Sequence, residues 1–346
     1  MDSICKSGIT HDASGGFNFY GRWETGVQAV SINSGSMVEF AYTGVHCTLY
    51  FDVQNFTHYP AVFLQVDEGP VCRTTLSCNV CTVPAVPEYN ILPDGQPPFS
   101  AVSSGYHIVR FWIACHSLYN TPASGQQWTT LNGGCKFIGV NLNGGDIVSL
   151  PYCSRQIEFL GDSITQGLRL LYTGLEEDTG NQMPYANWPQ LVANMLCMKP
   201  VVTGFGGQGL SASGTCGAPP ANAAFPYIYN NTEWHYSIPP EMVVIYHGTN
   251  DKVSPLEFEN LYSSYLTTIR KAYPDAAIFA ICPHDKINYA GAIQNAVNSL
   301  ADRKVWFLDY SAGIISPSET CDSRHLNPGG AIKLASAIAK DIAKLL

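Results

Sequence analysis

Residues 157–167 read IEFLGDSITQG. A mostly apolar run leads into Gly161, Asp162 and Ser163, which is the order expected where a buried strand ends and a helix begins. A serine at such a boundary commonly caps the helix. It serves instead as a nucleophile when a histidine and an acid lie close to it. Residues elsewhere in the chain are needed to distinguish a helix cap from a nucleophile.

Strands and helices alternate after this stretch. Apolar runs of strand length recur at KPVVT, MVVIY, AAIFAI and VWFLD, and the segments between them favour helices over residues 185–196, 255–273 and 291–302. Because such alternation builds a parallel sheet covered by helices, residues 154–346 are predicted to form a three-layer α/β domain. Sheets of this kind carry their sites just beyond the carboxyl ends of the strands.

Residues 1–153 have a different spacing of apolar residues. In VHCTLYFDV (45–53) every second residue from Val45 to Val53 is apolar, which is the period of a half-buried strand, and YHIVRFWIAC (106–115) repeats this pattern. Turn signals separate several such strands. The pattern predicts an all-β sandwich domain over residues 1–153.

The composition and charge argue against nucleic acid and membrane as binding partners. The 346 residues are 46% hydrophobic and 13% charged, which is typical of an ordered globular protein. With 27 acidic and 18 basic residues the net charge is -9. No basic patch is visible, so a nucleic-acid partner is not expected. No apolar run reaches the length of a membrane span. We expect a monomer that binds neither nucleic acid nor membrane.

The chain has 12 cysteines. The C-x-x-C pair of Cys78 and Cys81 has no second pair at zinc-site spacing. A disulfide framework, mainly in residues 1–153, is the favoured interpretation, and it implies an oxidising compartment. Glycosylation sequons at Asn55 and Asn230 agree with a secreted glycoprotein. We therefore expect a mature secreted protein whose signal peptide has been removed. The alternative is a reduced cytosolic protein with buried thiols.

Four loops at the strand ends contain the chemistry. They are GDS (161–163), GFGGQG (204–209), HGTND (247–251) and CDSRHLN (321–327). The second loop matches the dinucleotide fingerprint G-x-G-x-x-G, but LSASGTCGAPP follows it, which is poor helix material, so this interpretation is rejected. In the fourth loop Asp322 lies three residues before His325, so the carboxylate can orient the imidazole. With Ser163 these residues are the parts of an activated nucleophile, although the G-x-S-x-G elbow is absent.

The blocks GDSITQG, GFGGQG, GTND and DSRHLN resemble, in the same order, the four blocks of the SGNH (GDSL-type) serine hydrolases. A β-sandwich before such a domain, with GRW at residues 21–23, resembles the family two carbohydrate esterases, which are acetyl xylan esterase-like enzymes. The resemblance implies a three-layer α/β SGNH-hydrolase domain with a flavodoxin-like parallel sheet, preceded by an all-β jelly-roll or β-sandwich domain.

The resemblance also implies roles for particular residues. Ser163 is the expected nucleophile, His325 the general base and then acid, and Asp322 the group that fixes the tautomer of His325. The oxyanion hole is expected from the backbone N–H groups of Ser163 and Gly207 and the side-chain amide of Asn250. Gly206 is the alternative donor to Gly207.

Other polar residues near the strand ends are assigned lesser roles. Asp162 and Asp251 are expected to bond nearby backbone amides. His247 and His284 are rival bases without an acid three residues away. No metal and no cofactor is expected, because no His/Cys/Asp cluster suggests one.

The resulting hypothesis is a secreted serine esterase that hydrolyses O-acetyl esters of an acetylated polysaccharide or oligosaccharide through an acyl-enzyme. The alternatives are a short-chain lipase or aryl-esterase of the same superfamily, and a carbohydrate-binding protein with a degenerate hydrolase domain. Trp23, Trp188 and Trp234 are candidates for a sugar cleft, with core packing as the competing interpretation.

Overall fold

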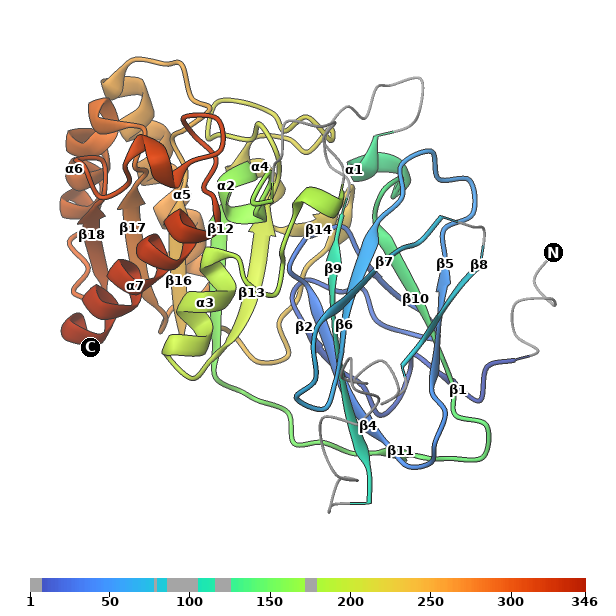
Figure 1. Ribbon diagram of the computed structural model, residues 1–346. Helices are drawn as coiled ribbons and strands as arrows, with labels where there is room; N and C mark the ends of the chain where they lie inside the picture. Colours follow the sequence, from blue (N-terminus) through green and yellow to red (C-terminus); the bar gives the residue numbers. More distant parts are fainter. Residues whose placement is uncertain (1–7, 78–79, 86–104, 116–125, 172–178) are drawn as a thin grey trace.

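The computed structural model describes residues 8–77, 80–85, 105–115, 126–171 and 179–346. Two antiparallel sheets face each other in the N-terminal half (Figure 1). The first has the order β1-β10-β5-β8, with β3 also paired to β10, and the second has the order β11-β4-β9-β6-β7, with β2 also paired to β4. This confirms the predicted β-sandwich.

The elements of this half have the following bounds: β1 His11–Asp12, β2 Asn18–Tyr20, β3 Ala29–Ser31, β4 Met37–Tyr42, β5 Thr48–Asp52, β6 Ala61–Val66, β7 Cys72–Thr75, β8 Val80–Pro84, β9 His107–Ala114, α1 Gln127–Thr130, β10 Cys135–Asn141 and β11 Ile147–Val148. The alternation predicted for residues 45–53 holds within β5, but Val45 precedes the strand and is 73% exposed. Strand β9 is buried on both faces from Phe111 to Ala114. Trp112, on its outer face, donates from Nε1 to Gln190 of the C-terminal half at 2.9 Å.

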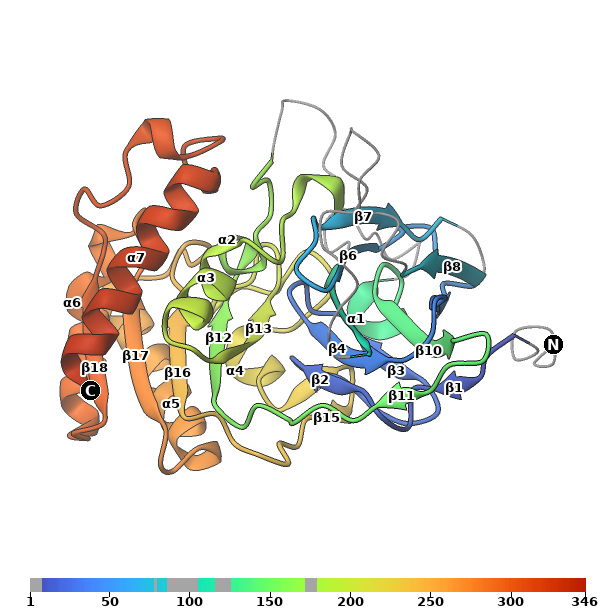
Figure 2. The same cartoon turned by 60° about the horizontal axis from the view of Figure 1, so that its bottom comes forward.

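The C-terminal half contains one parallel sheet with the order β13-β12-β16-β17-β18. In chain order this is 2-1-3-4-5, the flavodoxin-like arrangement that the resemblance implied. Helices α3 and α7 pack on one face and α5 and α6 on the other, so the sheet is the middle of three layers (Figures 1 and 2).

The elements of this half are β12 Gln156–Gly161, α2 Ser163–Gln166, α3 Trp188–Met195, β13 Lys199–Gly204, α4 Ala221–Ala224, β14 Tyr227–Tyr229, β15 Thr232–Glu233, β16 Met242–Tyr246, α5 Pro255–Ala272, β17 Ala277–Cys282, α6 Ala290–Leu300, β18 Val305–Asp309 and α7 Pro328–Leu345. Residues 149–155 connect β11 to β12. A division into two folding units at residues 153 and 154 stays a prediction.

A buried ion pair joins the two halves. Arg22 of the GRW segment and Glu158 of β12 are both fully buried, with 2.8 Å between Nη2 and Oε1. The other terminal nitrogen of Arg22 donates to the carbonyl oxygens of Phe225 and Tyr227. Burial by itself lowers the pKa of Arg22, but the charge of Glu158 raises it above the ordinary value, so the guanidinium stays charged.

The predicted disulfide framework is wrong for the described cysteines, which the structure does not join to one another by disulfides. Those present as free thiols are Cys47, Cys72, Cys115, Cys135, Cys153, Cys197, Cys216 and Cys282. Cys47, Cys115 and Cys135 lie in the sandwich core, where burial raises the pKa of each thiol above its ordinary value. Such cysteines act as small apolar residues, which explains their number without cross-links. Cys78 lies outside the described residues.

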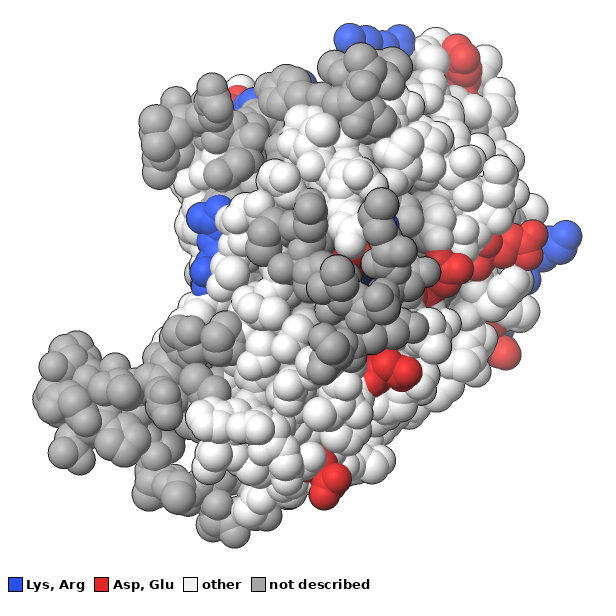
Figure 3. Space-filling view, turned by 90° about the vertical axis from the view of Figure 1, so that its right-hand side faces the viewer, with Lys and Arg blue, Asp and Glu red and all other residues white. Residues whose placement is uncertain are grey.

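Charged residues make up 13% of the chain. On the face seen in Figure 3, the described Lys, Arg, Asp and Glu residues are few and scattered, and no basic patch forms there. None of the helices in the described ranges combines the length and apolarity that crossing a membrane requires.

Candidate active site

Ser163 is held at a sharp turn between β12 and α2. The turn leaves no room for a side chain at Gly161, since a Cβ there would lie 2.0 Å from Thr165 Oγ1 and 2.9 Å from the carbonyl oxygen of Tyr246. Asp162 is the N-cap of α2, and its Oδ1 accepts from the backbone N–H of Ile164 at 2.9 Å. Asp162 therefore caps the helix, and the Ser163 hydroxyl is left for another partner.

That partner is His325. Its Nε2 lies 2.9 Å from Ser163 Oγ, and its Nδ1 lies 2.8 Å from Asp322 Oδ2. The backbone N–H of His325 also donates to Asp322 Oδ1 at 2.8 Å. An antiparallel bridge between Thr320 and Leu326 closes the loop that carries both residues. The structure thus brings the three predicted catalytic residues together in one hydrogen-bonded chain.

Arg169 is a member of this site that the sequence did not reveal. It follows α2 in a left-handed conformation, with φ of 60°, and its Nη1 is ion-paired with Asp322 Oδ2. The same carboxylate oxygen therefore contacts Arg169 and His325. Because 153 positions separate Arg169 from Asp322, no local pattern could have connected them.

The surroundings of these groups shift their proton affinities. Burial lowers the pKa of His325 below its ordinary value, and the contact with Asp322 opposes this only in part. Burial works to raise the pKa of Asp322, but hydrogen bonds from His325 and Arg169 lower it well below the ordinary range. Near neutral pH the site therefore holds an ionised Asp322 beside a neutral His325, which is the state of a general base.

The three candidate oxyanion donors lie in neighbouring segments. The side-chain amide of Asn250 donates to Asp162 Oδ2 at 3.2 Å and to the carbonyl oxygen of Gln208 at 2.9 Å. Asp162 adjoins Ser163 and Gln208 adjoins Gly207, so Asn250 ties the two loops together. Gly207 has φ of 73°, the left-handed region that favours glycine.

The rival bases do not reach Ser163. Both ring nitrogens of His284 are engaged, by the Tyr246 hydroxyl and by the carbonyl oxygen of Arg324. His247 is buried, and burial lowers its pKa to about 4. Asp251 accepts from the backbone N–H groups of Leu210 and Ser211, as predicted for a structural residue.

The predicted sugar-contacting role of Trp188 is wrong. Its side chain is 0% exposed and packs on Phe159 and Tyr246 in the core. Its Nε1 donates to the carbonyl oxygen of Ile164 at 3.2 Å, so it supports the turn that carries Ser163. Trp23 and Trp234 line a groove with Gln156, at the opposite end of β12 from Ser163.

Known proteins share this architecture. A curated relative, the cellulase/esterase CelE of Acetivibrio thermocellus, is 25% identical over 297 residues, which are 80% of this chain and 33% of the relative. The chain thus spans about a third of the length of that relative. A family two carbohydrate esterase from Clostridium thermocellum, solved in complex with cellohexaose, has a TM-score of 0.77, 22% identity and coverage of 96% of this chain and 100% of that one.

A second solved structure is also similar over nearly the whole chain. The acetyl xylan esterase Est2A from the rumen bacterium Butyrivibrio proteoclasticus has a TM-score of 0.77 at 16% identity and covers 96% of this chain and 97% of its own. These likenesses show that the whole fold, sandwich included, is the fold of the family two carbohydrate esterases. The model of the GDSL-like lipase/acylhydrolase family matches residues 159–332, about half of the chain. The chain therefore belongs to the GDSL-like lipase/acylhydrolase family.

Proposed function

We propose that this protein is an esterase that removes O-acetyl groups from a polysaccharide or its oligosaccharides, with Ser163 as nucleophile. The observation that carries the proposal is the chain of contacts from Ser163 Oγ through His325 to Asp322, with separations of 2.9 and 2.8 Å. The carbohydrate class is supported by the sandwich-plus-hydrolase fold, which is shared with proteins named as carbohydrate esterases.

In the first half of the reaction, His325 Nε2 takes the proton of Ser163 as Oγ attacks the acetyl carbonyl carbon. The charge that develops on the carbonyl oxygen is stabilised by the N–H groups of Ser163 and Gly207 and by Asn250. Both hydrogens of the Asn250 amide have acceptors in this structure, so one of them must turn from Asp162 or Gln208 to the substrate.

Collapse of this intermediate breaks the bond to the sugar oxygen. His325 returns the proton to that oxygen, and the sugar leaves with a free hydroxyl while the acetyl group remains on Ser163. In the second half, His325 takes a proton from water, whose oxygen attacks the acetyl-enzyme, and acetate is released as Ser163 regains its proton. Asp322 stabilises the charged imidazole in both halves.

The loop beside Ser163 supports the proposed preference for short acyl groups. The loop GFGGQGLSASG (204–214) consists mostly of small residues, and its bulky members Phe205 and Leu210 are 2% and 3% exposed. A Cβ on Gly204 would lie 2.8 Å from the carbonyl oxygen of Asp162, so the loop adjoins the nucleophile. The exposed part of this loop therefore offers no long apolar side chain to an acyl chain.

The test is the sign of the trend with acyl length. On a common chromogenic leaving group, kcat/KM should fall from acetate through butyrate to octanoate, and acetylated xylan or a similar glycan should release acetate. An apolar acyl channel would instead add roughly 0.8 kcal/mol of favourable burial per methylene. A maximum at octanoate without acetate release from any acetylated glycan would favour the lipase alternative. Hydrolysis of none of these esters would favour the degenerate binding protein.

We also propose secretion with glycosylation. The sequon residues Asn55 and Asn230 are exposed, as glycosylation requires. Expression through a eukaryotic secretory pathway, followed by treatment with an N-glycosidase, should lower the apparent mass. An unchanged mass would remove this support.

A further inference from the structure

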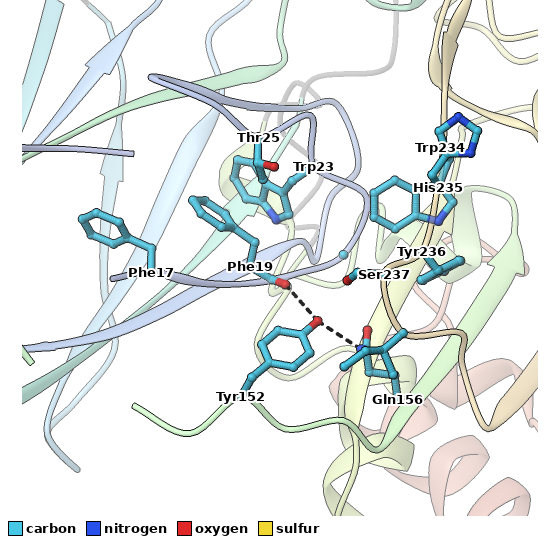
Figure 4. Close-up of a pocket in the computed structure, with 12 residues that line it drawn as sticks. Phe17, Phe19, Trp23, Thr25, Tyr152, Gln156, Trp234, His235, Tyr236 and Ser237 are labelled. Carbon is cyan, nitrogen blue, oxygen red and sulfur yellow. Dashed lines mark hydrogen bonds between the residues drawn. The ribbon is translucent and has the colours of Figure 1, made fainter. Parts of the chain in front are cut away.

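A groove of about 530 Å³ lies where the two halves meet, at the amino end of β12. Phe17, Phe19 and Trp23 line one side, Trp234, His235 and Tyr236 line the other, and Tyr152 and Gln156 lie between them (Figure 4). A volume of this size is within the range of small-molecule sites.

The groove is distant from the catalytic chain. Gln156 is the first residue of β12 and Ser163 follows the last one. At about 3.3 Å per residue along an extended strand, the two lie roughly 20 Å apart. A ligand in the groove therefore leaves the nucleophile free.

The aromatic rings of the groove are held in fixed orientations. The Trp234 ring meets Tyr236 edge-on with centroids 4.7 Å apart, and Tyr236 meets Tyr273 edge-on at 5.3 Å. On the other side, the partly buried Phe19 packs on Trp23 with centroids 5.5 Å apart, and Trp23, which is 3% exposed, supports this wall from the sandwich core. Rings that are already ordered lose little conformational freedom when a ligand stacks on them.

The chemistry of the lining fits an uncharged ligand with both apolar faces and hydroxyl groups. Among the described residues that line the groove, none is Lys, Arg, Asp or Glu. The lining also carries the hydroxyls of the exposed residues Thr25 and Ser237. The hydroxyl of the exposed Tyr152 accepts from the buried Gln156 amide and donates to the carbonyl oxygen of Phe19. A sugar ring has this combination, with C–H groups on its faces and hydroxyls at its edge.

A second cavity adjoins the first, and its lining includes Glu233 and Lys271. This cavity also measures about 530 Å³, and it shares Trp234, His235 and Tyr236 with the first. The shared segment is accessible, because the side chain of His235 is 79% exposed. A chain of several sugar units could contact both cavities by crossing this segment.

We propose that the groove is a non-catalytic binding site for a neutral polysaccharide, which keeps the enzyme on its polymeric substrate. The proposal rests on the proposed function for the class of ligand, but it concerns a different surface. It therefore makes separate predictions about glycan binding and about ester hydrolysis.

The experiment compares the wild-type chain with two groove variants and two controls. Trp234→Ala removes a ring of the wall. Ser237→Arg places bulk and charge in the groove from an exposed position, without removing an internal contact. Trp306→Ala is the matched aromatic control, since Trp306 is partly buried against Phe279 on β17. Ser163→Ala removes the nucleophile. Binding is measured by affinity electrophoresis in arabinoxylan, mixed-linkage β-glucan and glucomannan, and hydrolysis with a small chromogenic acetate.

Both groove variants should weaken retardation by at least one glycan by about fivefold or more, and both should hydrolyse the chromogenic acetate at the wild-type rate. Trp306→Ala should match the wild type in both assays. Ser163→Ala should lose hydrolysis but keep glycan binding, so a failed nucleophile assignment is seen separately. If Ser237→Arg binds every glycan as the wild type does, the proposal is overturned. Binding of an apolar fluorescent probe is measured alongside. The proposal is also overturned if both groove variants lose the binding of this probe but are retarded by every glycan as the wild type is.

Discussion

Replacing Arg22 tests what joins the two halves of the molecule. In Arg22→Ala, the carboxylate of Glu158 stays fully buried without its cation, and the carbonyl oxygens of Phe225 and Tyr227 lose their donor. Removing one partner of a buried pair typically costs about 3–5 kcal/mol, because an uncompensated charge is left behind. We expect the free energy of unfolding to fall by that amount.

The same loss can be expressed as a melting temperature. For 346 residues the entropy of unfolding is about 0.7 kcal/mol/K, so Tm should fall by about 4–7 °C if the chain unfolds as one unit. The assay is urea unfolding followed by circular dichroism, together with scanning calorimetry. A second calorimetric transition in the variant would show that the halves have become uncoupled.

A matched control is present in the chain. Arg155 and Glu241 form a pair at 3.3 Å with side chains 51% and 45% exposed, so Arg155→Ala should cost less than about 1 kcal/mol. The double variant Arg22→Met/Glu158→Leu should recover at least half of the loss, since apolar residues can replace a buried pair. If Arg22→Ala costs no more than Arg155→Ala, the reasoning about this junction is refuted.

Four further outcomes are expected. Ser163→Ala should abolish ester hydrolysis and leave Tm nearly unchanged; retained turnover would exclude Ser163 as nucleophile. Asp322→Asn should lower kcat strongly, with ~10⁴-fold as the upper guide, and a loss below about threefold would remove Asp322 from the mechanism. Because burial lowers the pKa of His325, the neutral base should persist below pH 6.5, so the acidic limb of the kcat/KM profile should lie below that pH. Arg169→Gln removes a nearby cation and should therefore move this limb to higher pH. An unmoved limb would contradict the influence of Arg169 on the pKa of His325. Thiol titration of the denatured, unreduced protein should find at least the eight free cysteines named above, and few thiols would contradict the structure.

The arrangement of the catalytic half could be predicted because its signals are local. Each apolar run sits at strand length between helical segments, and parallel strands bring their carboxyl ends to one edge of the sheet. Gly161 pairs in register with Gly204 on one side and Tyr246 on the other, so the loops after these three strands meet. The meeting of Ser163, Asn250 and Gly207 follows from that geometry.

The errors arose where tertiary contacts decide the role of a residue. Trp188 looks like any tryptophan near a strand end, but it fills the core beneath α2. Arg169 has no sequence signal, because its partner lies in a distant loop. Twelve cysteines indicated cross-links, yet those in the sandwich core are small buried apolar residues, and composition alone does not distinguish the two uses.

The turn at residues 161–163 shows why a serine can follow a strand and still do chemistry. A serine that caps its helix directs its hydroxyl at backbone N–H groups, and it is then unavailable as a nucleophile. Here Asp162 accepts from the N–H of Ile164, and the hydroxyl of Ser163 is left for His325. The second oxygen of Asp162 holds Asn250, so one carboxylate positions both the turn and an expected oxyanion donor. The aspartate of GDS is therefore structural in its contacts, and the proposed catalysis depends on it for that reason.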